Sequence, residues 1–172
     1  MAVTPLLTID VDGGADLRAA FVMAPEVTTR ELVAAAWEGS LLLQREIQEI
    51  TPTGVGQGGG LKGSISAREP RVLADNVIGT VGTALSYAVP VELGTRPHFP
   101  PVIALVDWVR AKFGARGAEA ERIAGAVARK IAIHGTEGAH MFERGFDANA
   151  AQVRRIFDRA LGRIFAAIGG RK

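Results

Sequence analysis

The sequence predicts an α+β fold in which a small antiparallel sheet packs against a long N-terminal helix and C-terminal helices. Three observations support this prediction: apolar residues recur at helical spacing early and late in the chain, residues 61–82 alternate as a β-hairpin does, and a strand-like segment lies near the N-terminus. A chain of 172 residues favours one domain, residues 1–172, with a core of its own.

The first half of the chain is expected to hold the N-terminal strand and the long helix. Residues 6–11 (LLTIDV) carry β-branched side chains, and the turn residues Asp12-Gly13-Gly14 follow them, which is typical of a strand. Thr28 and Glu31 have the spacing of a capping box, so the helix is predicted to begin at Thr28. It should end near residue 50, because Pro52 disfavours a helical residue before it. Trp37 falls on the apolar face of this helix and is expected in the core.

A hairpin over 61–82 is expected next. Apolar residues and glycine alternate with polar residues over 61–68, Glu69-Pro70 is typical of a turn, and residues 72–82 alternate again. Residues 86–93 are ambiguous, although Pro90 argues against a central strand there.

Three helices are predicted in the last third of the chain. The segment 94–101 (GTRPHFPP) contains three prolines that fix φ, so it should be a rigid Pro-rich loop. Helical stripes of apolar residues then appear within 102–113, 123–131 and 153–168, and Gly135-Thr-Glu-Gly138 separates the second from the third.

The glycine-rich segment 53–60 contains Gly54, Gly56 and Gly59 in a G-x-G-x-x-G pattern. A dinucleotide site needs a strand before these glycines and a helix after them. The predicted order here is a helix before and a strand after, and Lys62 is not followed by Ser or Thr as in a P-loop. The segment is therefore predicted to be a flexible loop that orders on an assembly surface.

The sequence offers no set of residues that predicts catalysis. It has no cysteine, and His98, His134 and His140 do not have the spacing of a full metal site. A Gly-x-Ser-x-Gly nucleophile elbow is absent. We therefore expect no enzyme activity, no catalytic residues, no cofactor and no metal.

Hydropathy and charge bear on location and partners. No signal peptide and no run of 18 apolar residues is seen, so no membrane span is expected. Residues 1–95 hold six Lys and Arg against eleven Asp and Glu, whereas residues 96–172 hold fourteen against seven. Such asymmetry is compatible with a nucleic-acid surface or with complementary ends on neighbouring copies.

Motifs between residues 51 and 142 resemble those of a known family. They are Thr51-Pro52 and then GLKGSI at 60–65, YAVPVELGTRPHFPP at 87–101, Ile123-Ala124 through ARKIA at 128–132, and Gly135-Thr136-Glu137-Gly138. Together they resemble the small tail-component family of long-tailed, lambda-like phages and prophages, over roughly residues 28–168. The segment 87–101 is the most specific part, and the expanded glycine segment is the clearest departure from the family pattern.

The resemblance implies a structural protein of the virion neck that acts in tail completion, or head–tail joining, and is assembled in the host bacterial cytoplasm. Its implied partners are further copies of itself in a ring around the DNA channel, which is commonly six-fold in that family. The resemblance also implies three other partners: a head-side connector or stopper, a tail terminator or tail-tube protein, and DNA bound without sequence specificity.

Two loops are the predicted protein interfaces. In the glycine segment they are Gly54, Gly56, Gly58 and Gly59, which are expected to order on docking. In the Pro-rich loop they are Arg96, His98 and Phe99, although that loop could equally be a connector that orients the next helix.

Three alternatives remain open from the sequence. The first is a tail terminator that caps the tail tube. The second is a soluble nucleotide-binding enzyme that uses Gly54–Gly59. The third is a small DNA-binding accessory protein that uses the basic C-terminal half.

Overall fold

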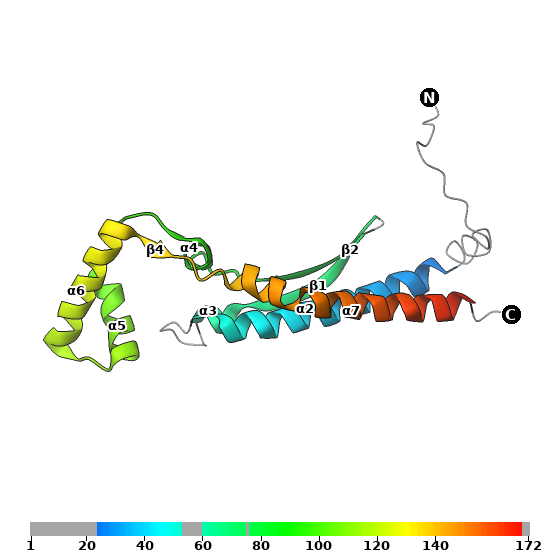
Figure 1. The fold of residues 1–172 in the computed structure, drawn as a ribbon, viewed down its shortest axis with the longest axis horizontal. Helices are drawn as coiled ribbons and strands as arrows, with labels where there is room; N and C mark the ends of the chain where they lie inside the picture. The colour runs from blue at the N-terminus through cyan, green and yellow to red at the C-terminus, as the bar shows by residue number, and fades with distance from the viewer. Residues whose placement is uncertain (1–23, 53–59, 75, 170–172) are drawn as a thin grey trace, which may run out of the picture.

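The structure, a computed structural model, describes residues 24–52, 60–74 and 76–169 and confirms an α+β fold. Figure 1 shows an elongated rod in which helices α2 and α7 lie side by side with the β1–β2 hairpin along α2, and an arm of α5 and α6 stands at one end. The predicted N-terminal strand lies outside the described residues. The elements are α2 Pro25–Ile50, α3 Gly60–Ser64, β1 Ser66–Leu73, β2 Asn76–Gly82, α4 Ala88–Leu93, β3 Gly94–Thr95, α5 Val102–Phe113, α6 Gly117–His134, β4 Thr136–Glu137 and α7 Met141–Gly169.

Helix α2 begins at Pro25, so the predicted start at Thr28 is wrong. Proline suits the first turn because its fixed φ is already helical and its missing N–H would have had no helical partner. Thr28 lies inside the helix, and its buried Oγ1 finds no hydrogen-bond partner among the described residues. The helix ends at Ile50 as predicted, because Thr51 turns to extended backbone before Pro52.

Small residues let α2 and α7 approach closely. Ala35 of α2 and Ala160 of α7 are fully buried and cluster with Ile156, which is also buried. Two ion pairs, each 2.7 Å long, join the exposed edges of the helices: Arg159 to Glu38 and Arg163 to Glu31. Trp37, predicted to be in the core, is 38% exposed because it turns away from this seam.

The hairpin differs from the predicted 61–82 in its start and in its turn. Residues 60–64 form the one-turn helix α3, and Leu61 within it and Ile65 directly after it both enter the core. Glu69-Pro70 is not the turn but an irregularity in β1, where the register shifts between Arg68 and Arg71. Proline fits there because it has no N–H to give to a sheet ladder.

One face of the hairpin packs on α2. Gly79 of β2 lies so close to the helix that a Cβ would fall 2.5 Å from Ser40 Oγ and 3.0 Å from the Ala36 carbonyl oxygen. At the other end of the hairpin, Ile65 joins a core cluster with Ile47 and Met141, so α7 begins against the same core.

The arm is the antiparallel pair α5 and α6, as the apolar stripes predicted. Val109 of α5 packs against Ala120 and Ala124 of α6, and all three are fully buried. Trp108 and Phe113 meet edge to face with ring centres 5.6 Å apart. The arm therefore has a small core separate from that of the rod.

Candidate functional site: the junction between rod and arm

The arm joins the rod through two very short strands. Strands β3 and β4 are antiparallel, with Gly94 opposite Glu137 and Thr95 opposite Thr136. The two threonine hydroxyls lie 2.9 Å apart, within hydrogen-bond distance. The Gly-Thr steps at 94–95 and 135–136, far apart in the sequence, therefore build one structure. The predicted Pro-rich loop 94–101 is in part this ladder, since Gly94 and Thr95 form β3.

Glycine is required at this crossing because the two backbones touch. Gly94 has φ +77° and Gly135 has φ +71°, a region that other residues rarely adopt. A Cβ on Gly94 would collide with the backbone of β4, and one on Gly135 with the backbone of Thr95. A Cβ on Gly138 would likewise collide with the backbone carbonyl oxygen of Glu92.

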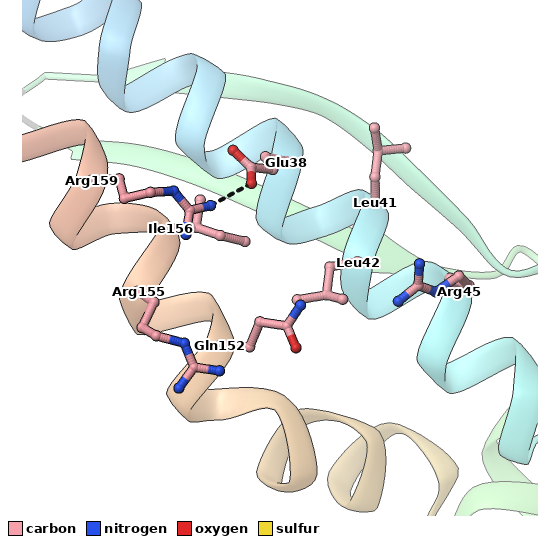
Figure 2. A pocket seen from close by; sticks show the side chains of 8 residues that line it. All are labelled: Glu38, Leu41, Leu42, Arg45, Gln152, Arg155, Ile156 and Arg159. Atoms are coloured by element: carbon pink, nitrogen blue, oxygen red, sulfur yellow. Dashed lines mark hydrogen bonds and ion pairs between the residues drawn. The ribbon is translucent and has the colours of Figure 1, made fainter. Parts of the chain in front are cut away.

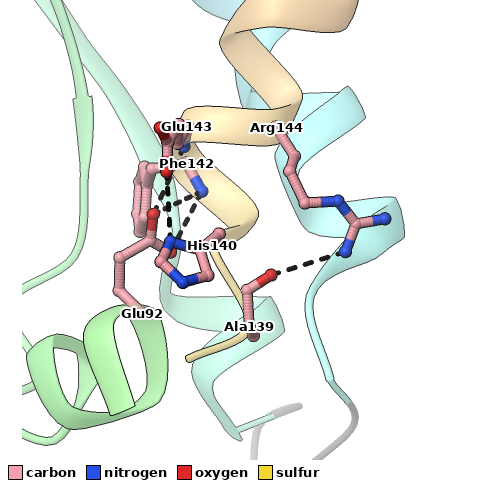
Figure 3. A network of polar contacts seen from close by, with 6 residues as sticks. All are labelled: Glu92, Ala139, His140, Phe142, Glu143 and Arg144. Carbon is pink, nitrogen blue, oxygen red and sulfur yellow. Dashed lines mark hydrogen bonds and ion pairs between the residues drawn. The ribbon is translucent and has the colours of Figure 1, made fainter. Parts of the chain in front are cut away.

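Glu92, at the end of α4, caps the start of α7 (Figure 3). Its carboxylate accepts hydrogen bonds from the backbone N–H groups of Phe142, at 3.1 and 3.2 Å, and of Glu143, at 3.2 Å. Its backbone carbonyl accepts the N–H of His140 at 3.1 Å. A carboxylate at a helix N-terminus satisfies free N–H groups and complements the helix dipole. Glu92 thus ties α4 to α7 across fifty positions of sequence.

His140 occupies the turn before α7. Its φ is +47°, and its Nδ1 lies 3.1 Å from a carboxylate oxygen of Glu143. The preceding N–H, of Ala139, donates to the Val91 carbonyl at 2.8 Å. The His140 ring contacts Glu143 (Figure 3), and among the described residues no group that combines His134 with His140 could hold a metal ion.

The structure brings the predicted contact residues of the Pro-rich loop together at the base of the arm. Arg96, His98 and Phe99 are all exposed, and Phe99 is 65% accessible. His98 is also tied in place: its N–H donates to the Ile131 carbonyl at 3.4 Å, and its Nδ1 lies 3.0 Å from the Arg96 carbonyl oxygen. These bonds tie the loop to the end of α6, whereas the contact of Arg96, His98 and Phe99 with a partner stays a prediction.

The other predicted interface residues, Gly54, Gly56, Gly58 and Gly59, lie outside the described residues. Their flanks are described, and α3 follows the segment where a strand was predicted. The dinucleotide arrangement still lacks its first part, since helix α2 rather than a strand leads into the glycines.

A groove between α2 and α7 went unpredicted (Figure 2). Its volume is about 510 Å³, and Leu41, Leu42 and Ile156 give it an apolar side. Arg45, Arg155 and Arg159 surround it, with Arg159 held by Glu38. Glu38 and Arg159, which meet across the groove, are 121 positions apart in the sequence, so no local motif could have revealed it.

Within residues 24–52, 60–74 and 76–169, no group of three or more His, Cys, Asp or Glu side chains could hold a metal ion. No described helix is long and apolar enough to cross a membrane. Comparisons of the chain with protein-family models, curated proteins and solved structures found no match.

Proposed function

We propose that this chain is a structural protein of a phage neck, which completes the tail and joins it to the DNA-filled head as a ring around the DNA channel. The observation that carries the proposal is the junction. Glu92 and the glycines and threonines of its two short strands lie in two motifs of the family resemblance, 87–101, which is the most specific part, and 135–138, and their contacts hold a protruding arm on a rod.

Exposed apolar side chains at the arm and junction support an assembly role. Large apolar residues that are more than 60% accessible gather there: Val89, Leu93, Phe99, Ile103 and Ile133. Apolar surface of this kind commonly marks a contact with another protein. We therefore assign the arm and its base as the surface that meets a neighbouring copy.

The distribution of charge suggests how copies would meet. Residues 24–52, mostly α2, carry five acidic and two basic side chains, whereas residues 94–140 carry seven basic and four acidic ones. An arm of one copy placed on the rod of the next is a head-to-tail contact, which closes into a ring at the right rotation. Opposite charges would steer this encounter.

Particle assembly tests the proposal directly. In a phage or prophage that carries this gene, deletion should leave full heads and tails of normal length that do not join, and the plasmid-borne gene should restore joining. Electron microscopy gives the readout. Overlong tails would instead indicate a tail terminator, and unchanged virions would refute a neck role.

The purified chain tests the ring and the enzyme alternative. Light scattering and native mass spectrometry should show a closed oligomer that double substitution of Ile103→Lys and Phe99→Lys reduces to a monomer. Matched lysines at Ala111 of α5 and Ala118 of α6, both exposed positions on the arm, are the control. If the glycine segment bound ATP, GTP or NAD, that nucleotide at a hundred times its dissociation constant would raise the free energy of unfolding by about 2.7 kcal/mol, which a thermal-shift assay would detect. We expect no shift.

A further inference from the structure

The two edges of the hairpin differ. The edge of β1 is protected: Gln44 Oε1 accepts the Ala67 N–H at 2.7 Å, and Gln48 Nε2 donates to the Ile65 carbonyl at 2.8 Å. Further along, Pro70 offers no N–H at the irregularity in the register. Side-chain cover, proline and bulges are the usual means by which proteins protect sheet edges.

The edge of β2 has no such protection. Asn76–Gly82 contains neither proline nor a charged residue. Since Ala67 directs its N–H away from β2, its partner Val81 directs its own N–H and C=O away from β1. Alternation along an antiparallel strand gives Val77 and Gly79 the same outward direction. Among the described residues β2 pairs with β1 alone, so no described segment covers this edge, which is called the open edge below.

The open edge lies on the side of the hairpin that adjoins α7. Around α2, at 100° per residue, Gln44 faces β1, then Ala36 lies against Gly79 of β2, and then Gly39 contacts Val153 of α7. Strand β2 therefore lies between β1 and α7. The arginine-lined groove of Figure 2 is on the other flank of the helix pair.

An apolar strip of α7 lies on the same flank of the helix pair as the open edge. Phe146, Val153, Phe157 and Leu161 follow one another at helical spacing on the flank of α7 away from Arg155 and the groove. Phe146 is 51% and Leu161 is 42% accessible, although both flank a buried seam. An open strand edge beside exposed apolar residues fits an extended segment that has one apolar face.

We propose that residues 6–11 of the same chain (LLTIDV) occupy this position as a third strand, antiparallel to β2. Leu7, Ile9 and Val11 alternate with Thr8 and Asp10, the pattern of a strand with one apolar face. That face would cover the strip of α7 and complete a three-stranded sheet across both long helices.

The length of chain before α2 favours the same copy over a neighbour. An antiparallel third strand would end beside the hairpin turn, which points toward the Pro25 end of the rod (Figure 1). Twelve residues, 12–23, connect residue 11 to Ala24 and can span about 40 Å. A tether of this length gives an effective concentration of the order of millimolar, far above that of a separate copy. The inference does not depend on the proposed virion role.

Hydrogen exchange of the full chain tests the pairing. Two variants are needed, Thr8→Pro and Ile9→Pro, because neighbouring N–H groups of a strand point to opposite edges, so that one of the two variants must lose an N–H that bonds to β2. That variant should exchange the Val77, Gly79 and Val81 amides at least about tenfold faster than the parent chain. Ala15→Pro, outside the proposed strand, is the matched control. Rapid exchange of these amides in the parent chain, or no response to either proline, would overturn the third strand.

Disulfide trapping identifies the source of the strand, since the chain has no cysteine of its own. Thr8→Cys combined with Thr80→Cys or with Ile78→Cys should oxidise within one chain, which a non-reducing gel shows as a faster-migrating monomer. Thr8→Cys with Ala111→Cys, on the arm, is the control and should stay reduced. A dimer band in place of the fast monomer would overturn pairing within one copy, and absence of any disulfide in both registers would overturn the proposal.

Discussion

Substitution of Glu92 should loosen the start of α7 and with it the junction. In Glu92→Ala the N–H groups of Phe142 and Glu143 lose the carboxylate that now accepts them at 3.1–3.2 Å. Loss of an N-terminal cap costs about 0.5–2 kcal/mol, and a hydrogen bond to a charged group contributes about 1.5–3 kcal/mol. For a half-buried carboxylate we expect about 2 kcal/mol, which for a chain of this size lowers Tm by about 4–8 °C.

Two further variants separate capping from charge. Glu92→Gln retains an acceptor oxygen but loses the charge at the helix dipole, so it should cost only about 0.5–1 kcal/mol. Glu121→Ala, an exposed glutamate within α6, should change stability by less than about 0.5 kcal/mol. Urea unfolding followed by circular dichroism measures all three. If Glu92→Ala were no more harmful than Glu121→Ala, the capping argument would be wrong.

Three other substitutions test separate parts of the structure. Gly94→Ala should lower the free energy of unfolding in urea by more than about 2 kcal/mol, because φ is +77° and the backbone of β4 occupies the space that a Cβ would need. The control, Gly162→Ala on the open face of α7, should be neutral or stabilise by up to about 1 kcal/mol. Equal effects of the two substitutions would contradict the close crossing. The Arg163 hydrogen bond lowers the pKa of Glu31 from its ordinary 4.5, so the ionised carboxylate stabilises the fold above that pH and the contribution disappears as the pH falls through the lowered value. Glu31→Gln should therefore lose less stability than the parent chain between about pH 5 and about pH 3, and parallel pH profiles would refute this. Deletion of Gly56–Gly59 should leave the circular dichroism spectrum and Tm unchanged yet stop heads and tails joining in the particle assay; normal joining would count against that role.

The helices α2, α5, α6 and α7 were predictable because each carries a long, repeated pattern of apolar residues, whereas the short helix α4 lies in a segment that was ambiguous. Helix α7 has apolar residues at helical spacing over about four turns, and its packing against α2 uses this same apolar face. The one-turn helix α3 was missed because five residues are too few to separate a period of two from one of 3.6. The buried residues Leu61 and Ile65, four positions apart, share a face in either period, so they do not separate a helix from a strand there.

The junction could be predicted only in part. The Gly-Thr steps at 94–95 and 135–136 are visible in the sequence, but the hydroxyl contact between Thr95 and Thr136 joins positions 41 residues apart. The capping role of Glu92 has no local sign, since local capping boxes span three residues and this one spans fifty. Thr28 shows the opposite case, in which a local pattern is present but is not used. Thr28 and Glu31 have the spacing of a capping box, yet the helix begins earlier, at Pro25.

The paired strands β3 and β4 make the arm an insertion in the topological sense. The chain leaves the rod at Thr95 and returns at Thr136, directly opposite, so a two-residue Asn-Gly turn would be long enough to replace everything between them. Excision would leave the helix pair and the hairpin of the rod with their sequence order intact. Rod and arm can accordingly diverge at different rates, and arms from related chains could be exchanged between rods at this one crossing.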